Sequence, residues 1–243
     1  MDRMIYIGMA GAKMDMQRQE VLSNNLANAS TVGFRAELQA IRAVPVRGDG
    51  ASTRVYSLET TVGYDDAAGP VTTTGRPLDV AVQGNAWLTV QGLDGTEAHT
   101  RFGSLAVTPE GVLVTQSGLP VLGDGGPVTL PPNSEPSIAP DGTVSVRDAN
   151  GTINQVARLK LVTPENKLVR GEDGLFRDPN GDVLPADANA RLQDGALEGS
   201  NVNPIETMIS MISAARQFEA QMKLIKTSET NEQTASRLLS SNA

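Results

Sequence analysis

Residues 203–240, NPIETMISMISAARQFEAQMKLIKTSETNEQTASRLLS, contain no glycine and a single proline at the second position. Asn203 can cap the free N–H groups of a helix, Pro204 suits the first helical position, and Glu206 can reach back to the cap. Apolar side chains then recur at steps of three and four, which predicts a long helix with a seam for another helix. The seam residues are Met208, Met211, Ala215, Phe218, Met222 and Ile225.

The first half of this helix carries a second apolar face, formed by Ile205, Ile209 and Ile212. Two apolar faces require more than one neighbouring element to cover them, and we expect that a single chain does not supply all of these neighbours. An isolated helix is only marginally stable in water, so the order of this helix must come from packing.

Residues 3–29 predict a second amphipathic helix, with apolar side chains on one side at helical spacing. That face consists of Ile5, Met9, Ala12, Met16, Leu22 and Leu26. Gly8 and Gly11 would let another backbone come close, at some cost in helix propensity. Periodicity alone leaves two interpretations open, a core helix of an ordinary domain or half of an intermolecular bundle.

Residues 24–35, NNLANASTVGFR, predict the end of this helix and a turn. Asn, Ser and Thr side chains compete with helical hydrogen bonds, and Gly33 can take a positive φ. We expect Phe34 to anchor the exit of the chain. The candidate residues of this stretch are Asn24, Asn25, Asn28, Thr31, Gly33 and Phe34.

The composition separates the ends of the chain from its middle. All 8 methionines lie in the two terminal segments, whereas most of the 24 glycines and 14 prolines lie between them. Residues 74–199 show short alternating apolar pairs separated by Asp-Gly and Asn-Gly, which suit hairpin turns. Val80, Val82, Leu88 and Val90 alternate around a Gly84-Asn85 break, as in one bulged strand.

These patterns predict an α+β fold, with two long terminal helices in a coiled-coil or bundle layer and an inserted antiparallel all-β domain. The expected division is an N-terminal helical assembly segment at 1–43 and a linker or extended stretch at 44–73. A β-rich outer domain at 74–199 follows, and the segment 200–243 packs with 1–43. The order of the strands cannot be read from the sequence.

Charge and composition narrow the functional classes. A net charge of −8 argues against binding to nucleic-acid phosphates or an anionic membrane surface. No apolar run approaches the length of a membrane span, so we expect no membrane insertion. The apolar run after Arg3 is too short for a secretory signal, although Ala10-Gly11-Ala12 resembles a cleavage site. Any export is therefore expected to leave the N-terminus uncleaved.

No catalytic, cofactor or metal site is expected. The chain has no cysteine and one histidine, which excludes cysteine-based and multi-histidine metal sites. Asp178, Asn180 and Asp182 have the spacing that begins a calcium loop, but the later loop positions lack the required Gly and Glu. We interpret this stretch as a hairpin turn, and His99 as an exposed strand residue without a nearby nucleophile.

Several stretches resemble the flagellar axial proteins, the rod and hook family. Residues 24–35 are similar to the family pattern at the end of its first helix. Residues 74–84 with 87–90, then 100–105, 111–114 and 118–123, resemble its β domain. Residues 195–202 lead into a final helix like that of the family. Trp87-Leu88 departs from the pair of aromatic residues frequent in the family, without affecting the resemblance.

The resemblance implies a structural, non-catalytic subunit of the flagellar basal-body rod, part of the axial drive shaft for motility. Length and the opening residues 1–6 look most like a proximal rod subunit, and a distal rod or hook subunit is the alternative. The implied partners are copies of itself, neighbouring proximal and distal rod proteins, and the flagellar export apparatus. The implied location is the rod in the periplasmic space. A hypothesis from another class is an extracellular β-rich binding domain with a helical oligomerisation stalk.

Overall fold

The computed structural model describes residues 3–45, 55–132, 134–148 and 151–241. The chain divides into two compact units. Unit 1 comprises Met1–Ala29, Ala36–Asp65 and Val202–Ala243, and unit 2 comprises Ser30–Arg35 and Asp66–Asn201. Each unit is therefore built from segments that are distant in the sequence.

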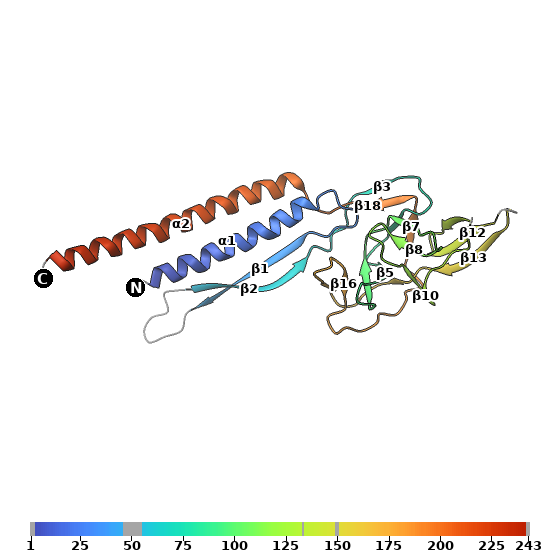
Figure 1. Ribbon diagram of the computed structural model, residues 1–243, viewed down its shortest axis with the longest axis horizontal. Coiled ribbons are helices and arrows are strands. Elements are labelled where there is room, and N and C mark those ends of the chain that lie inside the picture. Colours follow the sequence, from blue (N-terminus) through green and yellow to red (C-terminus); the bar gives the residue numbers. More distant parts are fainter. Residues whose placement is uncertain (1–2, 46–54, 133, 149–150, 242–243) are drawn as a thin grey trace. The chain divides into compact units, whose positions relative to one another are not determined.

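Unit 1 contains two helices and one hairpin. Helix α1 spans Arg3–Ala27, helix α2 spans Pro204–Ser241, and strands β1 (Glu37–Pro45) and β2 (Val55–Tyr64) form an antiparallel pair. Helix α1 contacts α2 and both strands, and it lies between α2 and the hairpin (Figure 1). The prediction of two long terminal helices is confirmed.

Helix α2 begins where its sequence predicts. The Asn203 side-chain oxygen accepts hydrogen bonds from the backbone N–H groups of Ile205 at 3.1 Å and Glu206 at 3.4 Å. The backbone oxygen of Asn203 accepts the first helical bond, from Thr207 at 3.0 Å. Asn203 is therefore the cap, and Pro204 occupies the first position, where no N–H group is needed.

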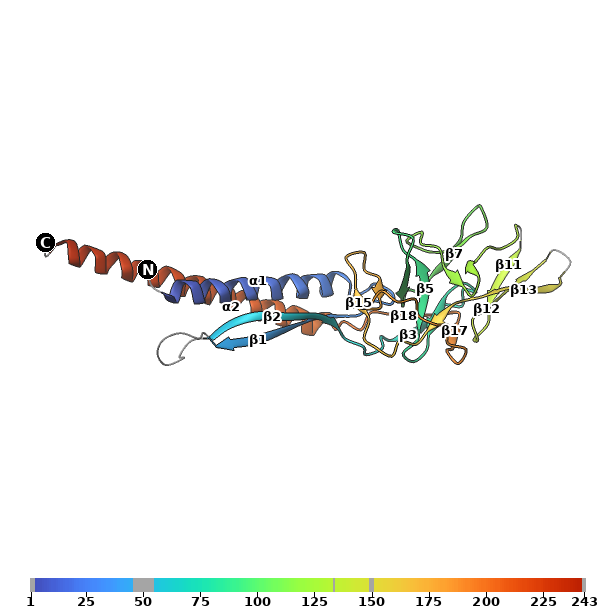
Figure 2. The same cartoon turned by 90° about the horizontal axis from the view of Figure 1, so that it is seen from below.

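The two helices run antiparallel and approach closely at small residues of α1. A side-chain carbon added at Gly8 would lie 3.0 Å from Ile225, and one added at Gly11 would lie 3.2 Å from Gln221. The predicted role of these glycines in close approach is thus confirmed. Helix α2 has 38 residues and α1 has 25, so the C-terminal part of α2 extends past the start of α1 (Figure 2).

Strands β1 and β2 lie in a part of the chain that the sequence analysis assigns to the end of the helical segment 1–43 and to the linker 44–73. The structure has two paired strands there instead, and residues 46–54 between them lie outside the described residues. Asn25 ties the hairpin to α1. Its amide N donates to the Glu37 carbonyl at 3.0 Å, and its amide O accepts from the Glu37 N–H at 2.8 Å.

Unit 2 consists of short strands whose assigned pairs are all antiparallel. Its largest sheet has the order β14-β5-β6-β16-β15, and a three-stranded sheet has the order β11-β12-β13. The strands are β3 (Val71–Thr73), β4 (Val80–Val82), β5 (Trp87–Gln91), β6 (Glu97–Thr100), β7 (Leu105–Val107), β8 (Leu113–Thr115), β9 (Leu122–Gly123), β10 (Gly126–Pro127), β11 (Glu135–Ile138), β12 (Thr143–Arg147), β13 (Ile153–Arg158), β14 (Leu161–Val162), β15 (Val169–Arg170), β16 (Phe176–Arg177), β17 (Leu192–Asp194) and β18 (Ala196–Glu198).

Valine and leucine side chains from several of these strands, and from segments between them, form one core, which includes Val80, Leu88, Val90, Leu105, Leu113, Val144 and Leu192. Trp87 packs beside it against Phe176, with ring centroids 4.6 Å apart. The predicted antiparallel β middle of the chain is confirmed.

Two details of the sequence interpretation are wrong. The residues around Gly84-Asn85 do not form one bulged strand, because β4 pairs with β17 and β5 belongs to the five-stranded sheet. His99 is not exposed. It lies on β6 with only 2% of its surface accessible, and its Nδ1 is 3.3 Å from the Thr89 hydroxyl. Burial lowers the pKa of His99 to about 4, so the ring is neutral at pH 7.

Candidate assembly faces and the Glu198 cluster

One side of α2 packs against α1. Met211, Phe218 and Ile225 are partly buried along this side, as the predicted seam requires. Between them lie small or polar residues that the apolar pattern did not identify. These are Thr207, Ala214, Gln221 and Ser228, and with the three apolar residues they recur at steps of three and four.

The remaining apolar residues of α2 are exposed. Ile205, Met208, Ile209 and Ile212 are 71%, 50%, 63% and 56% accessible. At about 100° per residue, Ile209 lies half a turn around the helix from Phe218, so this face points away from α1. Met222 is also exposed, and Ala215 is half-buried at the edge of the seam.

Helix α1 also divides its predicted face. Ala12 is buried, and Ile5, Leu22 and Leu26 are half-buried. Met9 and Met16 are exposed, and they share a stripe at steps of three and four with Tyr6, Lys13 and Glu20. The buried Met14 lies outside the predicted face. Each helix therefore has a stripe with exposed apolar side chains, which the described residues of its own chain leave uncovered; on α1 this stripe also contains Lys13 and Glu20.

The residues that follow α1 end the helix as their composition predicts. The amide N of Asn28 donates to both the carbonyl and the side-chain oxygen of Asn24, each at 2.9 Å. Thr31 accepts a backbone hydrogen bond from Phe34 at 3.3 Å. Gly33 has a φ of 67°, and its N–H donates to the Glu198 carbonyl at 2.7 Å. Phe34 is buried in unit 2, beneath the Arg170 guanidinium at 4.6 Å from the ring centroid.

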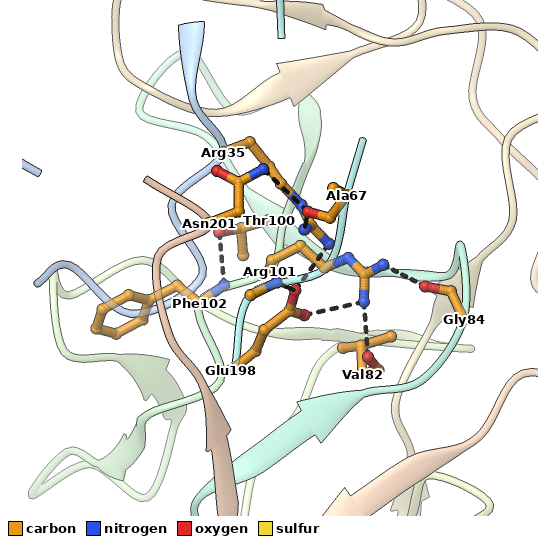
Figure 3. Close-up of polar contacts among 10 residues, drawn as sticks. Arg35, Ala67, Val82, Gly84, Thr100, Arg101, Phe102, Glu198 and Asn201 are labelled. Carbon is orange, nitrogen blue, oxygen red and sulfur yellow. Dashed lines mark hydrogen bonds and ion pairs between the residues drawn. The ribbon is translucent and has the colours of Figure 1, made fainter. Parts of the chain in front are cut away.

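Unit 2 holds a buried ionic group that we call the Glu198 cluster, made of Arg35, Arg101 and Glu198. The Glu198 carboxylate accepts from Arg35 at 2.8 Å and from Arg101 at 3.2 Å (Figure 3). The three side chains are only 2%, 2% and 3% accessible. Two guanidinium groups thus share one carboxylate away from water.

Backbone carbonyls accept further hydrogen bonds from the two guanidinium groups. Arg101 donates to the Val82 carbonyl at 2.6 Å and to the Gly84 carbonyl, and its guanidinium carbon lies 5.4 Å from the centroid of the Trp87 ring. Arg35 donates to the Ala67 carbonyl. Arginine keeps its charge in proteins, so these dipoles and the aromatic face help to stabilise the second positive charge.

The Glu198 cluster joins three stretches that the family resemblance identified separately, residues 24–35, 100–105 and 195–202. Arg35 is the last residue of the first segment of unit 2, Glu198 lies near the end of the second segment, and Arg101 lies within that second segment. The Asn201 N–H donates to the Phe34 carbonyl at 3.3 Å, and its amide N donates to the Ala67 carbonyl at 2.9 Å. The sequence contained Arg35, Arg101 and Glu198 within these motifs, but a pairing between distant residues has no local pattern.

Among the described residues, no group of three or more His, Cys, Asp or Glu side chains is placed to hold a metal ion. Asp178 and Asn180 form the turn that we expected, with the Asn180 N–H donating to the Asp178 carboxylate at 2.8 Å. Within the same residues, neither helix is long and apolar enough to cross a membrane.

Comparison with known families gives three matches along the chain. Residues 5–35 match the family described as flagella basal body rod protein, and residues 81–146 match the flagellar hook protein FlgE/F/G D1 domain. Residues 193–238 match the flagellar basal body rod FlgEFG protein C-terminal family. The first and last matches contain both uncovered stripes.

Full-length relatives agree with these matches. The chain is 48% identical to the flagellar basal-body rod protein FlgF of Salmonella typhimurium strain LT2, over 99% of both chains. It is 46% identical to FlgF of Escherichia coli strain K12, over 99% of both chains. It is 35% identical to FlgF of Caulobacter vibrioides, over 98% of both chains.

Proposed function

Because this chain belongs to the FlgF family of flagellar basal-body rod proteins, we propose that it acts as a structural, non-enzymatic subunit of the flagellar basal-body rod. Its function in this proposal is mechanical, since a subunit of an axial shaft transmits torque through its contacts with neighbours. The proposal depends on surfaces that hold subunits together.

The uncovered apolar stripe on α2 is the observation that supports assembly through the helices. Ile205, Met208, Ile209 and Ile212 are at least half exposed, although each is a residue type that burial favours. Fully burying one such side chain from complete exposure contributes about 1.5–3 kcal/mol. These four are 50–71% accessible, so covering their remaining surface would contribute roughly 4–7 kcal/mol before the entropy of association. A neighbouring subunit that covers these four side chains would gain this free energy. Their exposure in a single chain therefore supports a contact between subunits at this stripe.

The finer features of the proposal follow from the division of the chain. Residues 1–43 and 200–243 are the assembly segments, which join those of neighbouring subunits in a coiled-coil or bundle layer. Residues 74–199 form an outer β-rich domain, and residues 44–73 connect the two through the hairpin. Of the assembly residues expected from the sequence, we propose that the exposed ones contact neighbouring subunits, namely Met9, Met16, Ile205, Met208, Ile209, Ile212 and Met222. The buried ones, such as Ala12, Asn25 and Phe34, pack within the chain.

We place the subunit in the proximal rod, within the periplasmic space, next to copies of itself and to other proximal and distal rod proteins. It reaches this site through the flagellar export apparatus without cleavage of its N-terminus. A distal rod position is the alternative, because the chain is also 30% identical to the basal-body rod protein FlgG of Bacillus subtilis. The position of the subunit in a reconstruction of the basal body distinguishes the two.

The test replaces Ile209 with Asp in a strain that lacks the wild-type protein. We expect loss of swimming and loss of the subunit from purified basal bodies, with an unchanged circular dichroism spectrum of the purified monomer. Gln217→Asp is the matched control, because Gln217 is exposed on α2 outside the apolar stripe. Normal swimming of the Ile209→Asp strain would contradict the assembly role of this stripe.

A further inference from the structure

Leu93 is the most exposed large apolar side chain in the described part of the chain, with 90% of its surface accessible. It lies in the tight turn between β5 and β6. In this turn the Gly92 N–H donates to the Thr96 carbonyl at 2.8 Å, and the Gly95 N–H donates to the Gly92 carbonyl at 3.0 Å.

A second turn, between β15 and β16, has the same hydrogen bonds without a leucine. The Gly171 N–H donates to the Leu175 carbonyl at 2.8 Å, and the Gly174 N–H donates to the Gly171 carbonyl at 3.0 Å. The last glycine of each turn has a positive φ, 79° in the first turn and 77° in the second. An exposed glutamate, Glu172, occupies the position equivalent to Leu93. The backbone of this turn therefore does not require leucine at that position.

Both turns lie against one guanidinium group. Arg177 donates to the Asp173 carboxylate at 2.7 Å and to the Asp94 carboxylate at 3.5 Å. A carbon added at Gly92 or at Gly171 would lie 2.9 Å from a nitrogen of this guanidinium. We call residues 92–95 and 171–174 with Arg177 the Leu93 tip. Its three carboxylates are those of Asp94, Glu172 and Asp173.

Unit 2 also contains a largely apolar groove of about 490 Å³, a size within the range of ligand pockets. Its lining comes from β11, β12, β13, residue 134 and residues 76–78. The apolar lining residues are Pro77, Leu78, Pro136 and Ile153. Because Ile153 is 62% accessible, a partner can reach this lining from outside the chain.

The groove and the Leu93 tip carry opposite net charges. Arg147 is exposed at the groove, and Arg76 is 49% accessible while it pairs at 3.4 Å with the nearly buried Asp79. Glu135 is the carboxylate of the lining and stands opposite Arg147 in the strand register. The lining thus has two cations and one anion, whereas the Leu93 tip has one cation and three anions. Complementary charge favours this encounter over contacts between two like surfaces.

The tip and the groove belong to opposite ends of unit 2. Figures 1 and 2 show β15 and β16 towards one end of this unit and β11, β12 and β13 towards the other. A surface at one end that complements a surface at the other joins copies head to tail.

We propose that the Leu93 side chain of one copy enters the groove beside Ile153 of a second copy, with the tip carboxylates facing the groove arginines. This inference rests on the proposed function, in which copies of the chain are neighbours. One leucine in a groove is a small contact, well below the area of a stable interface. Neighbours already held by their helices present the two surfaces at high effective concentration, so the contact forms in the assembly and not between free monomers.

The experiment uses the natural absence of cysteine from the chain. Leu93→Cys/Ile153→Cys replaces the wild-type protein, and purified basal bodies are oxidised and separated on a non-reducing gel. We expect a ladder of dimers and larger species, because only a disulfide between copies increases the mass. Either single variant should give no ladder, and the double variant oxidised as a dilute monomer should give none. Val183→Cys/Ile153→Cys is the matched control without a ladder, since Val183 is 68% accessible but lies outside the Leu93 tip.

Three results of this experiment would overturn the proposed contact. The first is a double variant that supports swimming and is present in basal bodies but gives no ladder. The second is an equal ladder from the Val183 control pair, and the third is a dimer from Leu93→Cys alone, which would place tip against tip. Absence of the wild-type protein from purified basal bodies would overturn the proposed function, and the contact with it.

A second measurement leaves Leu93 and the apolar lining unchanged. Arg147→Lys keeps the positive charge at the groove and supplies an amine, which a zero-length carbodiimide can join to a nearby carboxylate. We expect linked peptides between position 147 and Asp94, Glu172 or Asp173 in oxidant-free basal bodies, and a ladder on the gel. Linkage of position 147 to Glu135 alone, in a variant present in basal bodies, would contradict the contact.

Discussion

In unit 2 the Glu198 carboxylate is bound by Arg35 and Arg101, and all three side chains are almost fully buried. Replacing a buried pair with apolar residues can be neutral, but removing one partner leaves an uncompensated charge. In this cluster the removal would leave two buried cations that cannot deprotonate.

We therefore predict that Glu198→Gln destabilises unit 2 by about 3–5 kcal/mol, measured by urea unfolding followed through Trp87 fluorescence. Asp66→Asn is the control. Asp66 pairs with Lys167 at 3.1 Å, but the two side chains are 55% and 49% accessible. Loss of such an exposed pair costs below about 1 kcal/mol. Equal effects of the two substitutions would show that the cluster is not a stabilising element.

A second residue-scale effect concerns acid. The pKa of His99 falls from an ordinary value near 6.5 to about 4 in the folded protein, because burial disfavours the charged ring. The unfolded chain therefore binds a proton on His99 below about pH 6.5, whereas the folded protein binds this proton only below about pH 4. Stability attributable to neutral His99 is complete above pH 6.5 and declines as the pH falls towards 4.

We predict that this decline reaches about 3 kcal/mol near pH 4, measured as the free energy of unfolding of the wild-type protein between pH 7 and 4. In His99→Gln the decline over the same interval should be smaller by about that amount. The carboxyls of Asp94, Asp141 and Asp187, whose pKa values are lowered by hydrogen bonds to threonine side chains and backbone N–H groups, act below this window. Parallel curves for the two proteins would contradict the role of His99.

At the scale of elements, the sequence predicts both helices, because each carries apolar residues at helical spacing and α2 carries its cap at Asn203. It predicts only half of the α2 seam. Met211, Phe218 and Ile225 follow the apolar pattern, whereas Thr207, Gln221 and Ser228 face α1 without being apolar. A hydrophobic pattern cannot identify small or polar residues that are chosen for close approach.

The hairpin was harder to predict for a related reason. Residues 37–64 show no clean alternation, since the pairing has a bulge between Ala40 and Ile41 that shifts the facing residues. The Glu198 cluster could not be predicted as a cluster, because its members become neighbours only when unit 2 closes. The sequence therefore identifies the stretches that contain Arg35, Arg101 and Glu198, but only the fold shows that these residues contact one another.

The close approach of the helices gives a prediction at this scale. Gly8→Val should separate α1 from α2, because a carbon added at Gly8 already lies 3.0 Å from Ile225. Overpacking of this kind costs about 1–3 kcal/mol, and hydrogen exchange of α1 should accelerate. Gly63→Val in β2 is the control, since a carbon added there meets nothing within 4 Å. Unchanged exchange in Gly8→Val would mean that the helices are not packed at this point in solution.

At the scale of the whole chain, the two units differ in what stabilises them. Unit 2 has a core of buried valine and leucine side chains and the Glu198 cluster. Unit 1 has elongated elements, and the part of α2 after about residue 230 has no α1 residue opposite it. Helices without tertiary contacts are marginal in water.

We therefore predict a gradient of hydrogen exchange in the purified monomer. Amides of residues 231–241 should exchange fastest, the remainder of the helices more slowly, and the strands of unit 2 slowest. In assembled basal bodies the amides of both helices should become protected. Full protection of residues 231–241 in a verified monomer would contradict this view of α2.

The hydrogen bond from Asn201 to the Ala67 carbonyl joins the two ends of the long segment 66–201. A segment with adjoining ends can be exchanged as a cassette, because its replacement needs no change in the spacing of the flanking chain. Chimaeras that carry this segment from a homologous subunit, with matching residues at 33–35 to preserve the Arg35 pairing, would keep their own helices. Such an exchange would vary unit 2 while the helices of unit 1 stay the same.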